Sequence, residues 1–216
     1  MGRKSLSAVL VIITLLCSGL ASATSTDIPR ILVVGDSWAA FVQIYRTLDY
    51  AMKDQPGMDG YGQRGQITSY FGIRASEVNT PEWLDAITSE LLAYPTIDIV
   101  HLSLGGNDFI LDSNWSPSMP PAQLDAFVNQ VNANTEAVID HILSIRPNIR
   151  IALCGYTYGN HPMGGGTVAQ MNEVWVQFEQ TRLNLCLSKP RLEYVHNLGL
   201  MQYYFGIPEA SPAIEP

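Results

Sequence analysis

Positive charge is scarce in this chain: 12 Lys and Arg residues stand against 20 Asp and Glu residues among 216, and the net charge is −8. Binding nucleic acid through the overall field of a protein needs an excess of Lys and Arg to neutralise phosphates, so the composition argues against that class. Charged residues make up only 15% and hydrophobic residues 47%. This is the composition of a chain that folds around a core, and its length suits one domain.

Long hydrophobic runs are equally scarce, and the one that stands out lies at the N-terminus. Arg3 and Lys4 precede the apolar stretch 8–16, and Ala21-Ser22-Ala23 forms a small-x-small site. This pattern is typical of a secretory signal peptide, and the run is too short for a bilayer span of about 20 residues. We expect a signal peptide at 1–23 and a mature domain at 24–216, secreted or periplasmic, with a net charge of −10 and no stable membrane insertion.

Cysteine is rare, with three in the chain, and Cys17 falls in the expected signal peptide. The remaining pair, Cys154 and Cys186, forms either a disulfide, which an oxidising compartment permits, or two buried free thiols. No cluster of residues has the spacing of metal ligands, and the glycine pattern does not match a dinucleotide-binding fingerprint. We therefore expect neither a metal nor a cofactor.

Strand-like apolar runs alternate with helical patterns along the mature chain. Alternation of this kind predicts an α/β fold, a three-layer α/β/α sandwich with a flavodoxin-like, mainly parallel five-stranded sheet. Strands are expected at 30–35, 67–71, 97–104, 149–154 and 192–198, and helices at 39–52, 81–93, 124–142 and 168–178. The glycine-rich stretches 55–65 and 156–166 are expected to be loops.

Chemistry-bearing residues follow the first and third of these strands. Gly35-Asp36-Ser37 comes directly after the first strand, and Gly105-Gly106-Asn107-Asp108 comes after the third. In an open α/β sheet, ligands bind beyond the carboxyl ends of the strands. A serine at a helix N-terminus and an Asn amide at the same edge are the parts that acyl transfer needs. Either motif alone is usually a helix cap or a turn, but both together, in this order, are hard to obtain by chance.

These two motifs resemble the first and third blocks of the SGNH (GDSL-type) hydrolase family. Its second block contributes a glycine, which we place at Gly72, with Gly65 as the alternative. The resemblance spans roughly residues 30–201 in element order. It implies that Ser37 is the nucleophile, and that the N–H groups of Ser37 and Gly72 and the side-chain amide of Asn107 form an oxyanion hole. An ester would be the small-molecule substrate. The rival α/β-hydrolase fold needs Gly-x-Ser-x-Gly, and Ala39 stands where the last glycine should be.

The family's fourth block, Asp-x-x-His, does not follow the last predicted strand, and no Asp occurs after Asp140. The simplest hypothesis is a chain cut short before its catalytic His and Asp. His161 and His196 lie near the expected site as substitutes, although Glu193 and His196, three apart on a strand, would point to opposite faces. His101 is expected in the core and His141 in solvent.

Three functions remain open on the sequence alone. The first is a serine esterase acting through an acyl-enzyme on Ser37. The second, motivated by the missing histidine block, is a non-catalytic domain that binds acylated sugar or lipid on the same fold. The third is a flavodoxin-like binder of phosphate or a nucleotide through the first loop, whose glycine content is too low for a dinucleotide fingerprint. The oligomeric state cannot be inferred from these patterns.

Overall fold

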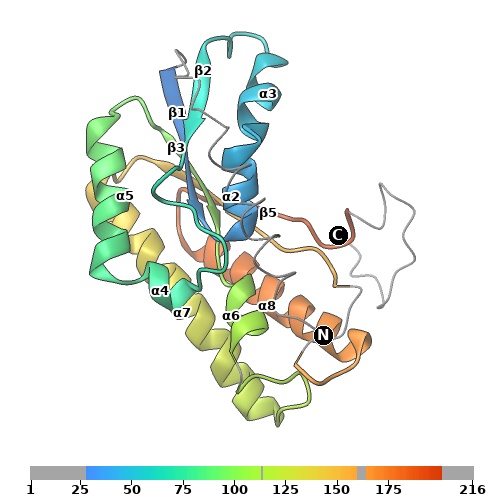
Figure 1. Cartoon of the computed structure of the whole chain (residues 1–216). Coiled ribbons are helices and arrows are strands. Elements are labelled where there is room, and N and C mark those ends of the chain that lie inside the picture. Colours follow the sequence, from blue (N-terminus) through green and yellow to red (C-terminus); the bar gives the residue numbers. More distant parts are fainter. Residues whose placement is uncertain (1–27, 113, 160–163, 201–216) are drawn as a thin grey trace, which may run out of the picture.

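The computed structural model describes residues 28–112, 114–159 and 164–200, and a parallel sheet runs through its centre (Figure 1). The strand order is β2-β1-β3-β4-β5, and all four pairings are parallel. This is the order of flavodoxin-like folds, so the predicted fold class is confirmed. The strands are β1 (Ile28–Gly35), β2 (Tyr61–Arg64), β3 (Ile99–Ser103), β4 (Arg150–Cys154) and β5 (Leu192–Val195).

Helices lie on both faces of the sheet, and the alternation of side chains along β1 shows how they divide. Ile31 and Val33 pack with α2 and α3, whereas Leu32 and Val34 belong to the larger core on the opposite face. The first pair of helices is α2 (Ser37–Ile44) and α3 (Thr47–Lys53). The larger core is closed by α4 (Ala75–Val78), α5 (Pro81–Ala93), α7 (Pro121–Ile145) and α8 (Val168–Ser188), and α6 (Gly106–Leu111) follows β3.

The helix and strands with the clearest sequence patterns lie where the sequence predicted them. In α7, Val128, Val131, Thr135, Val138 and Ile142 are all buried, as their spacing of three and four predicts. The predicted strands 30–35, 97–104 and 149–154 correspond to β1, β3 and β4, and 192–198 to the shorter β5. The expected signal peptide lies outside the described residues. Within the described ranges, no helix is long and apolar enough to cross a bilayer.

Two predicted elements were wrong around the sheet's first edge. The expected helix 39–52 is two helices, because Arg46 takes a left-handed conformation (φ 51°) between α2 and α3. The second strand is not 67–71 but Tyr61–Arg64, inside the predicted loop 55–65. The stretch 67–71 is a loop, which meets β1 in an isolated bridge between Ser69 and Gly35 and in hydrogen bonds near the end of that strand.

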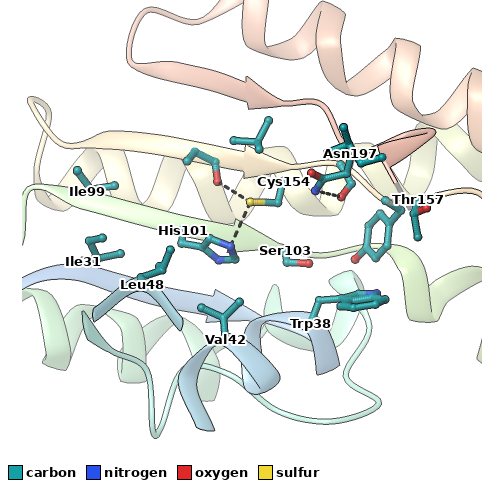
Figure 2. A pocket seen from close by; sticks show the side chains of 15 residues that line it. Ile31, Trp38, Val42, Leu48, Ile99, His101, Ser103, Cys154, Thr157 and Asn197 are labelled. Carbon is teal, nitrogen blue, oxygen red and sulfur yellow. Dashed lines mark hydrogen bonds between the residues drawn. The ribbon is translucent and has the colours of Figure 1, made fainter. Parts of the chain in front are cut away.

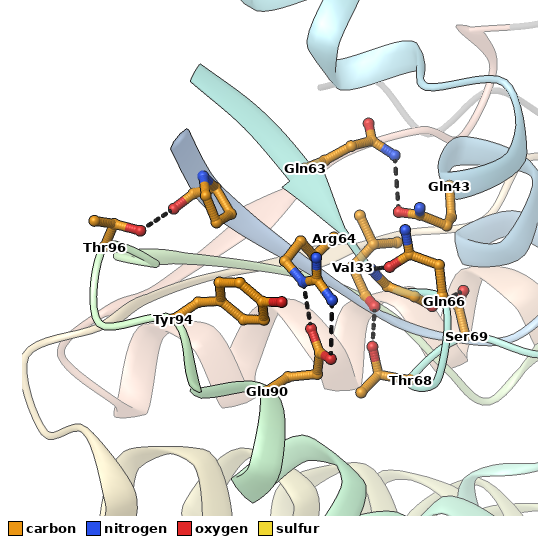
Figure 3. Close-up of polar contacts among 12 residues, drawn as sticks. Val33, Gln43, Gln63, Arg64, Gln66, Thr68, Ser69, Glu90, Tyr94 and Thr96 are labelled. Atoms are coloured by element: carbon orange, nitrogen blue, oxygen red, sulfur yellow. Dashed lines mark hydrogen bonds and ion pairs between the residues drawn. The ribbon is translucent and has the colours of Figure 1, made fainter. Parts of the chain in front are cut away.

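Strand β2 has no apolar run to predict it, because polar contacts hold it in place (Figure 3). Gln63 is buried, and its amide donates to Gln43 Oε1 at 3.1 Å while its backbone N–H donates to Asp49 Oδ1 at 2.7 Å. Arg64 pairs with Glu90 of α5 at 2.7 Å and lies over the ring of Tyr94. These partners are distant in sequence, so no local sequence pattern predicts the strand.

Candidate active site

Three loops meet where β1 and β3 end. Gly35 pairs with Ser103 at the end of the β1–β3 ladder, and its N–H donates to Thr68 O at 2.9 Å. The Thr68 hydroxyl also donates to Val33 O at 2.7 Å (Figure 3). The loop after β2 is thereby held against the loop after β1, and β3 brings the third loop alongside. The sequence expectation that the first and third motifs share one edge of the sheet agrees with this arrangement.

Ser37 is the first residue of α2, half-buried, directly beyond the end of β1. The sharp turn before it depends on Gly35, whose φ is +135° and whose added Cβ would overlap the Ser103 carbonyl. The helix then presents its free N–H groups at this position. Among the described residues, no hydrogen bond joins the Ser37 hydroxyl to another group, so it is free to face a substrate.

Asp36 caps α2 and lies in a buried polar cluster, 1% exposed. Its carboxylate accepts from Trp38 N at 3.1 Å, from Ser103 Oγ at 3.2 Å, and from the Tyr156 hydroxyl. Burial raises the pKa of Asp36, and the three donors oppose that rise. Asp36 therefore fixes the start of α2, and with it the position of Ser37, instead of facing the substrate itself.

The second and third motifs are tied together directly. Asn107, in the first turn of α6, donates from Nδ2 to Ile73 O at 3.0 Å, and Asp108 Oδ2 accepts from Ala75 N at 2.8 Å. An amide nitrogen has two N–H groups, so one of those on Asn107 remains for another acceptor. Burial raises the pKa of Asp108 to about 6. Phe71, just before Gly72, stacks edge-on against Phe41 of α2 with ring centroids 5.0 Å apart.

The two candidate glycines of the second block differ in their surroundings. Gly65 packs so closely against β1 that an added Cβ would lie 2.7 Å from Val33 O. Gly72 has φ +79° and open space around it. It borders a hollow of about 410 Å³ together with Phe71, Ile73 and Trp83, among others. Of the two, only Gly72 has backbone that a ligand can approach.

A buried charge pair that none of the sequence motifs indicated, Arg182 and Glu179 of α8, lies beneath this edge. Arg182 is fully buried and donates to Leu104 O at 2.6 Å and Cys154 O at 2.7 Å, the carbonyls just after β3 and at the end of β4. Glu179 accepts from Tyr156 N at 3.0 Å and from the Tyr194 hydroxyl. The sequence feature that could have indicated this pair is the spacing of Glu179 and Arg182, opposite charges three residues apart beside the apolar stripe of α8.

None of the described histidines forms a hydrogen bond with Ser37. His141, expected in solvent, is instead half-buried, with Nε2 at 2.9 Å from Thr88 Oγ1 and 3.1 Å from Leu84 O, so it joins α7 to α5. His196 follows β5, and its ring lies 6.0 Å from that of Tyr194. Glu193 pairs with Arg150 at 3.7 Å, away from His196, as the strand alternation predicted. His161 lies outside the described residues.

The spacing Asp-x-x-His occurs once in the chain, at Asp98 and His101, far before the last strand. Asp98 lies just before β3 and accepts from Arg30 Nε at 3.0 Å. His101 lies in mid-strand, where its Nε2 contacts Cys154 Sγ at 3.2 Å. Because residues three apart on a strand face opposite sides, these two do not form a catalytic pair.

Cys154 and Cys186 are both buried free thiols, which decides between the two alternatives left by the sequence. Cys154 lies on one face of the sheet and Cys186 in the core on the other. Burial raises the pKa of Cys154 to about 12 and that of Cys186 to about 11, so neither is a ready nucleophile. Among the described residues, no group of three or more His, Cys, Asp and Glu side chains has a geometry for a metal ion.

Neither a family model nor a curated protein matches this sequence. Several solved structures do match the fold of this chain. The lipase Lip_vut3 from a goat rumen metagenome superposes with a TM-score of 0.50 at 11% identity, covering 82% of this chain and 84% of the lipase. The chain has the fold of a known lipase. At this identity the likeness concerns the fold alone.

Two further structures are similar. A gut microbial diltiazem-metabolizing enzyme gives a TM-score of 0.52 at 12% identity, over 79% of this chain. The match covers 37% of that enzyme, so this chain spans little more than a third of its length. A family 3 carbohydrate esterase from Clostridium thermocellum gives a TM-score of 0.41 at 18% identity, over 77% of each chain.

Proposed function

We propose that this chain is a serine ester hydrolase of the SGNH (GDSL) type, with Ser37 as its nucleophile. The observation that carries the proposal is the placement of Ser37 at the N-terminus of α2, beside the third motif across the β1–β3 boundary. In flavodoxin-like sheets this boundary is the switch point at which ligands bind. The fold shared with a lipase agrees with this function.

The oxyanion hole is proposed to consist of the backbone N–H groups of Ser37 and Gly72 and the amide of Asn107. Asn107 supports the assignment because its bond to Ile73 O holds the amide in place and leaves one N–H free. Donors fixed in advance stabilise the negative oxygen of a tetrahedral intermediate without reorganising. We expect Asn107→Ala to lower the turnover of a chromogenic ester about 100- to 1,000-fold.

Serine needs a base to become a nucleophile, and no described histidine bonds to the Ser37 hydroxyl. The proposed mechanism therefore takes its base from a residue outside the described ranges. That base accepts the Ser37 proton as Oγ attacks the ester carbonyl, and returns a proton to the leaving alcohol. Water then hydrolyses the acyl-enzyme by the same route.

A fluorophosphonate probe tests the nucleophile directly. We expect covalent labelling of the full chain and its complete loss in Ser37→Ala. Ser76→Ala is the matched control, since Ser76 is an exposed serine on the neighbouring α4 and should leave labelling unchanged. Absence of labelling in the parent chain, or labelling that survives Ser37→Ala, would reject this assignment.

The substrate is proposed to be a carboxylic ester of a lipid or an acylated carbohydrate, hydrolysed outside the cytoplasm after removal of residues 1–23. The proposed leader rests on the sequence pattern of Arg3, Lys4 and the small residues up to Ala23. N-terminal sequencing of the exported protein is expected to begin at Thr24. A first residue of Met1 would contradict export by this signal.

A further inference from the structure

Hollows of different chemistry border the candidate active site. The larger, of about 540 Å³, lies over the sheet beside α2, and Trp38 lines its end nearest the Ser37 turn (Figure 2). Among the described residues that line it, none is Asp, Glu, Lys or Arg. Its one imidazole, His101, is kept neutral because burial lowers its pKa. The larger hollow therefore offers no ionic partner to a charged ligand.

The smaller hollow, of about 410 Å³, lies beside Gly72 and combines aromatic rings with carboxylates. The loop that precedes α4 forms one wall, and α4 with the first turn of α5 forms the other. Tyr70 and Trp83 meet across it edge to face, with ring centroids 6.3 Å apart. Glu77 and Glu82 line it as well, and no Lys or Arg of the described chain does.

The two carboxylates of this hollow are compensated to different degrees. Glu77 pairs with Arg74 Nη2 at 3.2 Å and accepts from Arg74 N at 2.8 Å, and these bonds lower the pKa of Glu77. Glu82 is exposed, and within the described ranges it forms no hydrogen bond or ion pair. The smaller hollow therefore keeps one uncompensated negative charge at its rim.

The aromatic side chains of this hollow are unusually open to solvent. Tyr70 is 63% exposed and Phe71 is 47% exposed. Adjoining apolar groups that stay exposed beside a candidate active site are typical of a ligand-binding surface. A neutral sugar could stack on the rings but gains nothing from the charge of Glu82, and an anionic group would be repelled by it. An alkylammonium group uses both, because ring faces and carboxylates attract a cation together.

We propose, resting on the esterase function proposed above, that the hollow beside Gly72 binds an alkylammonium group of the ester substrate. Gly72 belongs both to this hollow and to the proposed oxyanion hole, so an ester carbonyl at Gly72 N–H brings the rest of the substrate to the rings. A quaternary ammonium has no N–H to donate, so it needs ring faces and negative charge instead of hydrogen-bond acceptors. Tyr70 and Trp83 supply the faces, and Glu82 supplies the charge.

A pair of esters of equal shape tests the preference in the full chain. Acetylcholine and 3,3-dimethylbutyl acetate differ only in that a carbon replaces the charged nitrogen. We expect kcat/KM to be at least about 5-fold higher for acetylcholine. A hollow that is merely apolar would favour the neutral ester, so equal values or the reverse preference would overturn the proposal.

Substitutions in the hollow assign the preference to its residues. Glu82→Gln and Tyr70→Leu are each expected to lower the ratio of the two kcat/KM values about 2- to 5-fold. Tyr70→Phe keeps the ring face and is expected to recover the ratio that Tyr70→Leu loses. Asp59→Asn, at an exposed turn before β2, removes the same charge as Glu82→Gln and is the control. An equal effect of Asp59→Asn would assign the preference to the net charge of the protein and contradict this site.

Binding of tetramethylammonium gives a readout that does not depend on catalysis. In ¹H–¹⁵N spectra of the full chain, we expect a saturable shift of the Trp83 indole signal, which is assigned by its loss in Trp83→Phe. The buried indoles of Trp115 and Trp175 are internal controls, and the neutral alcohol neopentanol should produce a smaller shift at Trp83. No saturable shift at Trp83 up to about 100 mM tetramethylammonium would overturn the proposal.

The two readouts separate this inference from the proposed function. If both esters are hydrolysed at equal kcat/KM and the Trp83 signal does not shift, the cation site is wrong while the esterase function stands. If neither ester is hydrolysed but the Trp83 signal shifts on addition of the cation, the esterase function fails while the cation site stands.

Discussion

At the scale of single residues, two buried carboxylates in the candidate site differ in how they are compensated. Asp36 accepts from two side-chain hydroxyls and one backbone N–H. Asp108 accepts from Ala75 N, and its pKa is raised to about 6 by burial. A raised pKa means that the folded state favours the protonated form of the Asp108 carboxyl group. The folded protein therefore becomes less stable as pH rises through this pKa, whereas a salt-bridged acid would make it more stable.

We therefore predict that Asp108→Asn changes the pH dependence of stability. Between about pH 4 and pH 6 the native state binds more protons at this position than the unfolded state, so the parent loses stability as pH rises through that window. The loss amounts to up to about 3 kcal/mol for a shift of roughly two pH units. The amide of Asn cannot ionise. The variant is therefore expected to lack this loss of unfolding free energy between pH 4 and pH 7.

Urea unfolding at several pH values measures this difference. Asp85→Asn, at an exposed site on α5, is the control and should track the parent. Parallel stability curves for Asp108→Asn and the parent from pH 4 to pH 7 would contradict a raised pKa at Asp108.

At the scale of elements, the junction of β1, β3 and α2 depends on close backbone approach. Gly35 lies against the Ser103 carbonyl, and the Asp36 N–H donates to that same oxygen at 2.9 Å. The turn that exposes Ser37 is therefore built by packing between two strands rather than by the local Gly-Asp-Ser sequence alone.

Substitution of this glycine gives an element-scale prediction. Gly35→Ala is expected to destabilise the fold by at least about 3 kcal/mol, because a methyl group overlaps backbone that cannot move without breaking the β1–β3 ladder. Gly57→Ala is the matched control: Gly57 also has a positive φ (+76°) but nothing within 4 Å, so only conformational strain of about 1–2 kcal/mol is expected. Thermal and urea unfolding of both variants give the comparison, and equal losses would contradict the steric account.

At the scale of the whole molecule, one buried arginine links distant parts of the fold. Arg182 bonds the ends of β3 and β4 to α8, and its guanidinium lies over the rings of Phe178 and Tyr156. Tyr156 in turn donates to Asp36 at the start of α2. Helix α8 and the Ser37 turn are thus coupled through one polar network.

Loss of this arginine is therefore expected to lower the stability of the whole fold. Arg182→Met is expected to cost about 3–5 kcal/mol in the free energy of unfolding, since two carbonyls lose their donor and Glu179 loses its counter-charge. Arg191→Met, at an exposed arginine before β5, should change stability by less than about 1 kcal/mol. If the two variants were equally stable, the network would have no structural role. If Arg182→Met does not accumulate as folded protein, Arg182→Lys, which retains the charge, is expected to recover part of the lost stability.

Elements with local sequence signals could be predicted without the structure. The apolar runs of β1, β3 and β4 and the stripe of α7 mark buried faces through their periodicity, and motif order places Ser37 and Asn107 beyond neighbouring strands. The remaining features depend on contacts between residues that are far apart along the chain. Strand β2 is held by Gln63 and Arg64 through partners far along the chain, and Arg46 breaks a helical pattern by its backbone conformation. The two thiols stay apart because they lie on opposite faces of the sheet, a separation that no spacing along the chain encodes.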